Sequence, residues 1–221
     1  TVGALALNLR GRLGIDGTSG TFVLDVDGDL GSLTPWLTRL AGMHDLAAAG
    51  RISGHLEARA ASAGLAATGT ITTTLSAVSK GERLLAKDVR AAIVLTGQRA
   101  QVKELTGSAL GGHFAAAANA PLVWVNRWLP SGAQLEQPSI DVPATHEGTA
   151  SFDVPALFAL FERTPTETLG GSFELSAKLS TSRPDAAAVL GELRLERAEM
   201  AVGEVRYVLS DVTRLRLAGG V

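Results

Sequence analysis

Residues 20–60 read GTFVLDVDGDLGSLTPWLTRLAGMHDLAAAGRISGHLEARA, and this stretch decides the fold. Apolar and polar residues alternate at its start, which is the pattern of a half-buried strand. Thr34 and Pro35 suit the N-cap and the first position of a helix, which we expect over residues 35–49. Gly50 ends that helix, and the alternation then resumes. The predicted order is therefore strand, helix, strand.

The same order returns in residues 148–180, which read GTASFDVPALFALFERTPTETLGGSFELSAKLS. Asp153 precedes a helix expected over residues 155–162, and Gly170-Gly171 opens the next strand. A third helical stretch of one or two turns is predicted in PLVWVNRWLP, residues 121–130. A unit used twice at long spacing favours an extended β assembly.

Period-two alternation predicts strands through most of the remaining chain. Leucines take every second place in much of residues 5–15, and threonines take the alternate places of residues 68–76. We therefore expect a mainly β fold, an elongated antiparallel sheet of about a dozen strands with about three short helices. Further expected strands cover residues 84–96, 99–106, 108–118, 191–197, 200–209 and 212–218.

The chain divides into two predicted repeats. The first covers residues 1–130 and includes the helix at 35–49. Residues 131–149, with Pro138 and Pro143, are expected to form a linker or an irregular edge. The second repeat covers residues 150–221 and is expected to be truncated at its C-terminus, because both ends of the sequence fall within strand patterns.

The bulk composition excludes several classes of function. The 221 residues carry a net charge of −2 with both signs interspersed, so no basic surface for nucleic acid is expected. There is no cysteine, which excludes disulfides, thiolate metal sites and cysteine nucleophiles. No apolar run reaches the roughly 18–20 residues of a membrane-spanning helix.

No catalytic motif is readable, and we predict that the protein is not an enzyme and uses no cofactor or metal. The sequence contains no nucleophile elbow, phosphate loop or dinucleotide fingerprint. Asp25, Asp27 and Asp29 are superficially similar to a calcium loop, but the glycine at its sixth position and the closing glutamate at its twelfth are missing, so they are interpreted as an acidic turn before the helix. The histidines are scattered and are expected to be solvated or rim residues: His44, His55, His113 and His146.

Three short helices cannot cover a dozen strands. The apolar face of the sheet must then either fold back on itself or stay open as a groove for an apolar ligand. We predict the groove, with the lining residues Leu5, Leu7, Leu9, Leu13, Ile15, Ile71, Leu75, Leu175, Leu179, Leu193 and Leu195. Trp36, Trp124 and Trp128 are placed at its rim, with the alternative that they anchor the helices on the sheet.

Glycine followed by alternating apolar residues begins several of the predicted strands. The segments are Gly54-His-Leu-Glu-Ala, Gly69-Thr-Ile-Thr, Gly171-Ser-Phe-Glu-Leu and Gly191-Glu-Leu-Arg-Leu. Together with the preceding helices and the APLVWVNRWLP stretch, this pattern resembles the TamB branch (translocation and assembly module) of the AsmA-like proteins, a family of bridge-like lipid-transfer proteins. The resemblance covers most of the chain and lies in the alternation of apolar and polar residues and in the repeat spacing.

The resemblance implies a sheet curled into a U-shaped trough with an apolar lining. It also implies a place in the periplasm of a diderm bacterium, within a protein anchored in the inner membrane that carries phospholipid towards the outer membrane. A partner of that family is an outer-membrane barrel of the BamA-like class, which would bind through regions outside this chain. Neither an anchor nor the partner-binding region is recognisable in these 221 residues.

Two functions therefore stand as expectations. In the first, acyl chains of phospholipid slide along the aliphatic lining of a lipid-transfer conduit. In the second, the chain is a structural or chaperone-like β module in outer-membrane protein assembly, with its apolar face packed shut. Lipid that co-purifies with the protein would separate the two.

Overall fold

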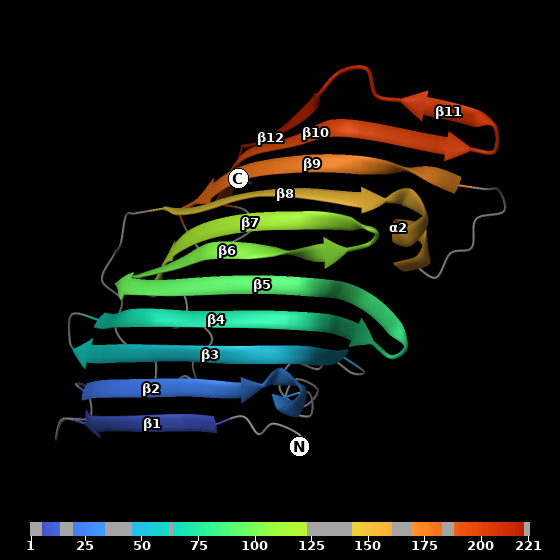
Figure 1. Ribbon diagram of the computed structural model, residues 1–221. Coiled ribbons are helices and arrows are strands. Elements are labelled where there is room, and N and C mark those ends of the chain that lie inside the picture. Colours follow the sequence, from blue (N-terminus) through green and yellow to red (C-terminus); the bar gives the residue numbers. More distant parts are fainter. Residues whose placement is uncertain are drawn as a thin grey trace.

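A single antiparallel sheet dominates the computed structural model, which describes residues 6–13, 20–33, 46–61, 64–122, 143–160, 169–182 and 188–218 (Figure 1). Its strands are β1 (Ala6–Leu13), β2 (Gly20–Asp29), β3 (Leu46–Ala61), β4 (Gly64–Lys80), β5 (Arg83–Gly97), β6 (Arg99–Ala109), β7 (Gly112–Pro121), β8 (Ala144–Asp153), β9 (Leu169–Thr181), β10 (Val189–Val202), β11 (Val205–Val208) and β12 (Thr213–Ala218). This architecture confirms the expected mainly β fold.

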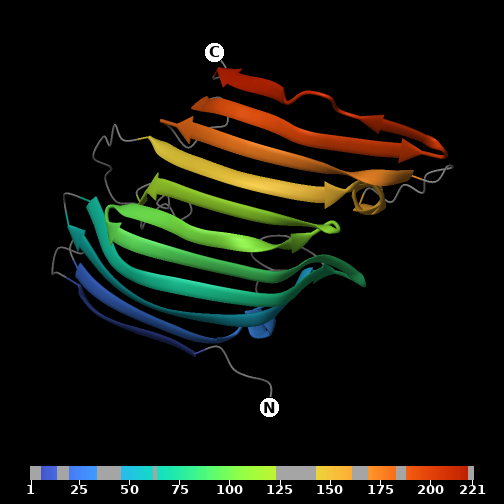
Figure 2. The ribbon, with the colours of Figure 1, turned by 45° about the horizontal axis from the view of Figure 1, so that its top comes forward.

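The strands follow one another in the sheet in chain order, from β1 to β11. The short strands β11 and β12 both pair with β10, one beside each end of it. The sheet is not closed, because β1 lies at one end of this order and β11 and β12 lie at the other. Figure 2 shows that the strands bow, so that the sheet is curved.

Helices are scarce among the described residues. The 3-10 helix η1 (Leu30–Leu33) packs against β3, and the α-helix α2 (Val154–Leu160) packs against β8 and β9. The helix expected over residues 155–162 is thus confirmed as far as residue 160. The helix expected over residues 35–49 is wrong at residues 46–49, because these pair with β4 in the ladder and pairing overrides the helix propensity of alanine.

Two predicted strand boundaries are corrected by hairpins. The strand expected over residues 108–118 is divided between β6 and β7 by a turn at Leu110 and Gly111, both at positive φ. The strand expected over residues 200–209 is divided between β10 and β11 by a turn at Gly203 and Glu204.

Two segments expected to be irregular belong to the sheet. Residues 144–149, placed in the predicted linker, form the start of β8, which pairs with β7 on one side and β9 on the other. Asp25, Asp27 and Asp29, interpreted above as an acidic turn, lie within β2. In both cases the alternation of side chains continues through the segment, and strand pairing follows it.

The recurrent glycines have a steric role in the ladder. Gly69 lies opposite Leu56, and Gly54 lies opposite Ile71, so that a glycine and a large residue face each other twice between β3 and β4. Gly69 has a φ of 141°, and a Cβ there would collide with the carbonyl oxygen of His55. Only glycine permits this close approach of the two backbones.

The hydrophobic core is thin. Among the described residues, the buried hydrophobic side chains are those of Val26, Ala67, Val89, Leu122, Ala144 and Val154. By contrast, the side chains of Leu7 and Leu9 are 62% and 66% exposed. Most apolar side chains are half-buried, which fits a single layer better than two packed layers.

Candidate functional site

Cross-strand register places one set of positions on a single face of the sheet, because side chains directly opposite in a ladder share a face. We call it the leucine face. Its described positions include Leu7 and Leu9; Phe22, Leu24 and Val26; Ile52, Gly54, Leu56 and Ala58; Ala67, Gly69, Ile71, Thr73 and Leu75; Val89, Ala91, Ile93 and Leu95; Ala100, Val102, Leu105 and Gly107; Phe114, Ala116 and Ala118; Ala144, His146, Gly148, Ala150 and Phe152; Phe173, Leu175, Ala177 and Leu179; Leu193, Leu195, Ala198, Met200 and Val202; Val205 and Tyr207; and Leu215 and Leu217.

None of these positions holds an aspartate, glutamate, lysine or arginine. In the described strands, ladder pairing puts charged residues on this face only at the β4–β5 hairpin, where Lys80 lies opposite Leu46 and Arg83. Charged side chains occupy the alternate positions, as in β3, where Arg51, Glu57 and Arg59 lie on the opposite face. The separation holds across β-bulges. In β6, Lys103 is the extra residue of a bulge, and Val102 and Leu105 on either side still share the leucine face.

The structure places most of the predicted lining residues on the leucine face. Leu7 and Leu9 lie opposite Val26 and Leu24, and Ile71 lies opposite Ile93. At the other end of the sheet, Leu175 lies directly opposite Leu195. The remaining placements are Leu75 opposite Val89, Leu179 opposite His146, Leu193 opposite Leu215, and Leu13 paired with Gly20.

Five other predicted site residues lie outside the described residues: Leu5, Ile15, Trp36, Trp124 and Trp128. Their lining and rim roles remain predictions.

An aromatic pair was not predicted. The rings of Phe152 and Phe173 stack with centroids 5.3 Å apart on the leucine face, beside α2.

The opposite face carries ion pairs that join neighbouring strands. Asp25 accepts hydrogen bonds from His55 Nδ1 at 2.6 Å and from Arg10 at 2.9 Å, and so connects β1, β2 and β3. These two hydrogen bonds, that of His55 first, hold the pKa of Asp25 below its ordinary value. The hydrogen bond of His55 to Asp25 raises the pKa of His55, and its interaction with Glu57 raises it further by a smaller amount. Beside them, Arg51 binds both carboxylate oxygens of Asp27.

A second group of ion pairs lies on this face at the other end of the sheet. Glu192 on β10 contacts Arg194 at 2.8 Å and Arg214 of β12 at 3.6 Å. The hydrogen bond from Arg194 lowers the pKa of Glu192. Glu199 contacts Arg206 of β11 at 2.7 Å, which lowers the pKa of Glu199. These pairs join the two short edge strands to β10.

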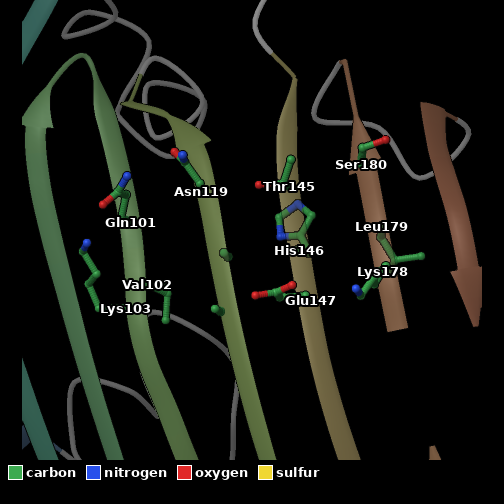
Figure 3. A pocket seen from close by; sticks show the side chains of 12 residues that line it. Gln101, Val102, Lys103, Asn119, Thr145, His146, Glu147, Lys178, Leu179 and Ser180 are labelled. Atoms are coloured by element: carbon green, nitrogen blue, oxygen red, sulfur yellow. The ribbon is translucent and has the colours of Figure 1, made fainter. Parts of the chain in front are cut away.

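A hollow of about 520 Å³ lies over β6, β7, β8 and β9 (Figure 3). Val102, Ala118, His146 and Leu179 contribute to it from the leucine face. Its other lining residues hold alternate positions along the same four strands: Gln101, Lys103, Ala117, Asn119, Thr145, Glu147, Lys178 and Ser180.

His146 is the residue that sequence reasoning missed. The sequence predicts a solvated or rim histidine in the linker, whereas the structure puts His146 half-buried within β8, on the leucine face. Ala144, His146, Gly148, Ala150 and Phe152 keep one parity along β8. That alternation is the signal that would have placed it.

The described residues contain no group of three or more His, Asp or Glu side chains placed to hold a metal ion. They also include no helix long and apolar enough to cross a membrane. A scan of protein-family models finds no match to this chain, and neither do searches of curated proteins and of solved structures. The resemblance to the TamB branch therefore stays a prediction.

Proposed function

We propose that this chain is part of a lipid-transfer conduit in which acyl chains lie along the leucine face. One observation carries the proposal: in the described strands, that face continues from β1 to β12 on a sheet that is not closed, and ladder pairing puts charged residues on it only at the β4–β5 hairpin, Lys80 and Arg83. Apolar surface of this extent that stays accessible in a folded protein marks a binding surface.

We place the leucine face on the concave side of the sheet, as the apolar lining of a U-shaped trough. Burial along the strands supports this placement. In β3, Ile52 and Leu56 are half-buried, whereas Ser53 and Glu57 on the opposite face are exposed. Curvature brings side chains closer together on a concave face and separates them on a convex one, so the less exposed face is the concave one.

The length of the leucine face supports a conduit over a single-ligand pocket. The path from β1 to β11 contains eleven strands, and a spacing of about 4.8 Å between neighbours gives roughly 50 Å. The acyl chains of one leaflet span about 15 Å, half of the hydrocarbon core. Burial of each methylene contributes about 0.8 kcal/mol wherever the chain lies, so an acyl chain can slide along the face.

The cellular setting of the proposal comes from the family resemblance. We propose that the cargo is phospholipid and that the conduit crosses the periplasm of a diderm bacterium, within a protein anchored in the inner membrane. Contact with an outer-membrane barrel of the BamA-like class would be made by regions outside this chain. Trp36, Trp124 and Trp128 are proposed to sit at the rim of the trough.

The experiment is photocrosslinking to phospholipid with p-benzoyl-phenylalanine in place of Ile71. The control position is Thr68, an exposed residue of the same strand on the opposite face. We expect a lipid adduct at position 71 and none at position 68. Equal labelling at both positions, or protein adducts alone at position 71, would contradict the proposal and favour the structural module.

Two arginine variants test whether lipid occupies the trough. Ile71→Arg and Leu175→Arg each introduce a charge where acyl chains would lie, and burial of an unpaired charge against hydrocarbon is costly. We expect both variants to retain the circular dichroism of the sheet and to lose most co-purifying phospholipid. The matched variant Thr68→Arg should keep its lipid.

A further inference from the structure

His146 is chemically unlike the rest of the leucine face. Among the positions named above for that face, it is the one imidazole, a side chain with both a hydrogen-bond donor and an acceptor or two donors. Its ring makes no hydrogen bond or ion pair with any described residue. An imidazole without a partner in apolar surroundings retains an unused donor, and a ligand can satisfy it.

The sheet leaves room for a ligand at this point. His146 lies opposite Ala118 on β7 and Leu179 on β9, and Ala144 and Gly148 precede and follow it on the same face of β8. Three of these four neighbours are alanine or glycine. Ala118 and Leu179 line, together with His146, the hollow of about 520 Å³.

The charged residues that line the hollow carry a net positive charge. On the face of His146, neither β7 nor β9 presents a titratable group to it. The charged residues that line the same hollow are Lys103, Glu147 and Lys178, which sum to one positive charge; Glu147 and Lys178 lie on the opposite face.

We propose that His146 binds the acidic group of an amphipathic lipid, a phosphate or carboxylate oxygen, while the acyl chain of that lipid lies along the leucine face. The imidazole N–H donates a hydrogen bond to the anionic oxygen, and the protonated ring donates a stronger, charge-assisted one. This inference rests on the proposed lipid trough and adds a fixed polar contact to it, at which acidic lipids dwell longer than neutral ones.

The test compares lipids that share acyl chains and differ in charge. Fluorescent phosphatidylglycerol and diacylglycerol are titrated into the protein at pH 7. We expect a preference for phosphatidylglycerol of at least about tenfold. Oleate against oleyl alcohol at pH 8 tests the carboxylate; a preference in either pair supports the site and identifies the source of the anion.

The deciding variant is His146→Leu, with His113→Leu as its control, because His113 is exposed on the opposite face. His146→Leu should erase the preference and leave diacylglycerol binding unchanged, whereas His113→Leu should leave both as they are. A preference that survives in His146→Leu, or no preference in the unchanged protein, overturns this inference alone. Failure of every lipid to bind overturns the proposed trough itself.

Discussion

His55 on β3 donates a hydrogen bond of 2.6 Å from Nδ1 to Asp25 Oδ1 on β2, across the face opposite the leucine face. Pairing with the carboxylate raises the pKa of His55 above its ordinary value of 6.5 and lowers that of Asp25 below 3.8. The contribution of His55 to stability is fully present below pH 6.5 and is lost as the pH rises through its raised pKa. The contribution of Asp25 is present above pH 3.8 and is lost as the pH falls through its lowered pKa.

We therefore predict that Asp25→Asn lowers the pKa of His55 towards its ordinary value, as measured by an NMR titration of the imidazole. The control is Asp27→Asn, which removes a neighbouring carboxylate that binds Arg51 and leaves the hydrogen bond to His55 in place. An unchanged His55 titration in Asp25→Asn would show that the two side chains are not coupled in solution.

Adjacent glycines at the start of β9 differ in what a side chain would meet, and they supply a second prediction. Gly171 has a φ of 118°, and a Cβ there would collide with the carbonyl oxygen of Glu199. At Gly170, a Cβ would touch only the Cβ of Ala201, at 3.7 Å. Gly171→Ala should lower the free energy of unfolding by about 1–3 kcal/mol, from backbone strain.

Chemical denaturation measures this difference, with Gly170→Ala as the control. Because a new methyl group makes only an ordinary van der Waals contact there, Gly170→Ala should change the denaturation midpoint little or raise it slightly. Equal effects of the two substitutions would mean that the close approach of β9 and β10 at Gly171 does not occur in solution.

The faces of the sheet could be predicted from sequence wherever alternation is unbroken. Ile71 and Leu75 on β4 are examples, since every second residue around them is threonine or serine. The face of a residue cannot be predicted beyond a β-bulge, because the extra residue reverses the alternation of side chains in the rest of the strand. Lys103 and Glu104, consecutive charged residues in β6, form such a bulge, and no turn residue marks it.

The turn between β6 and β7 begins at an unusual residue type. Leu110 adopts a φ of 51°, which a leucine rarely does, and it lies in an apolar stretch that continues a strand pattern. The candidate site likewise contains positions that alternation predicts and one that was missed. The aliphatic positions are predicted from period two. His146 is missed despite the alternation of β8, because a histidine between prolines and polar residues is typical of a loop.

The docking of the edge strand β12 supplies the last prediction. Glu192 on β10 contacts Arg214 of β12 at 3.6 Å and Arg194 of its own strand at 2.8 Å. Glu192→Gln removes the negative charge between these two cations and leaves them, with Arg216 nearby, to repel one another. We expect faster amide hydrogen exchange in β12 and unchanged exchange in β4, because β12 pairs with no described strand except β10.

Lowering the pH through the depressed pKa of Glu192 should accelerate exchange in β12 of the unchanged protein in the same way, relative to β4, once intrinsic rates are corrected for pH. The control variant is Glu204→Gln in the β10–β11 turn, which removes an exposed carboxylate away from β12. If both variants exchange alike, the sheet ladder alone holds β12 in place.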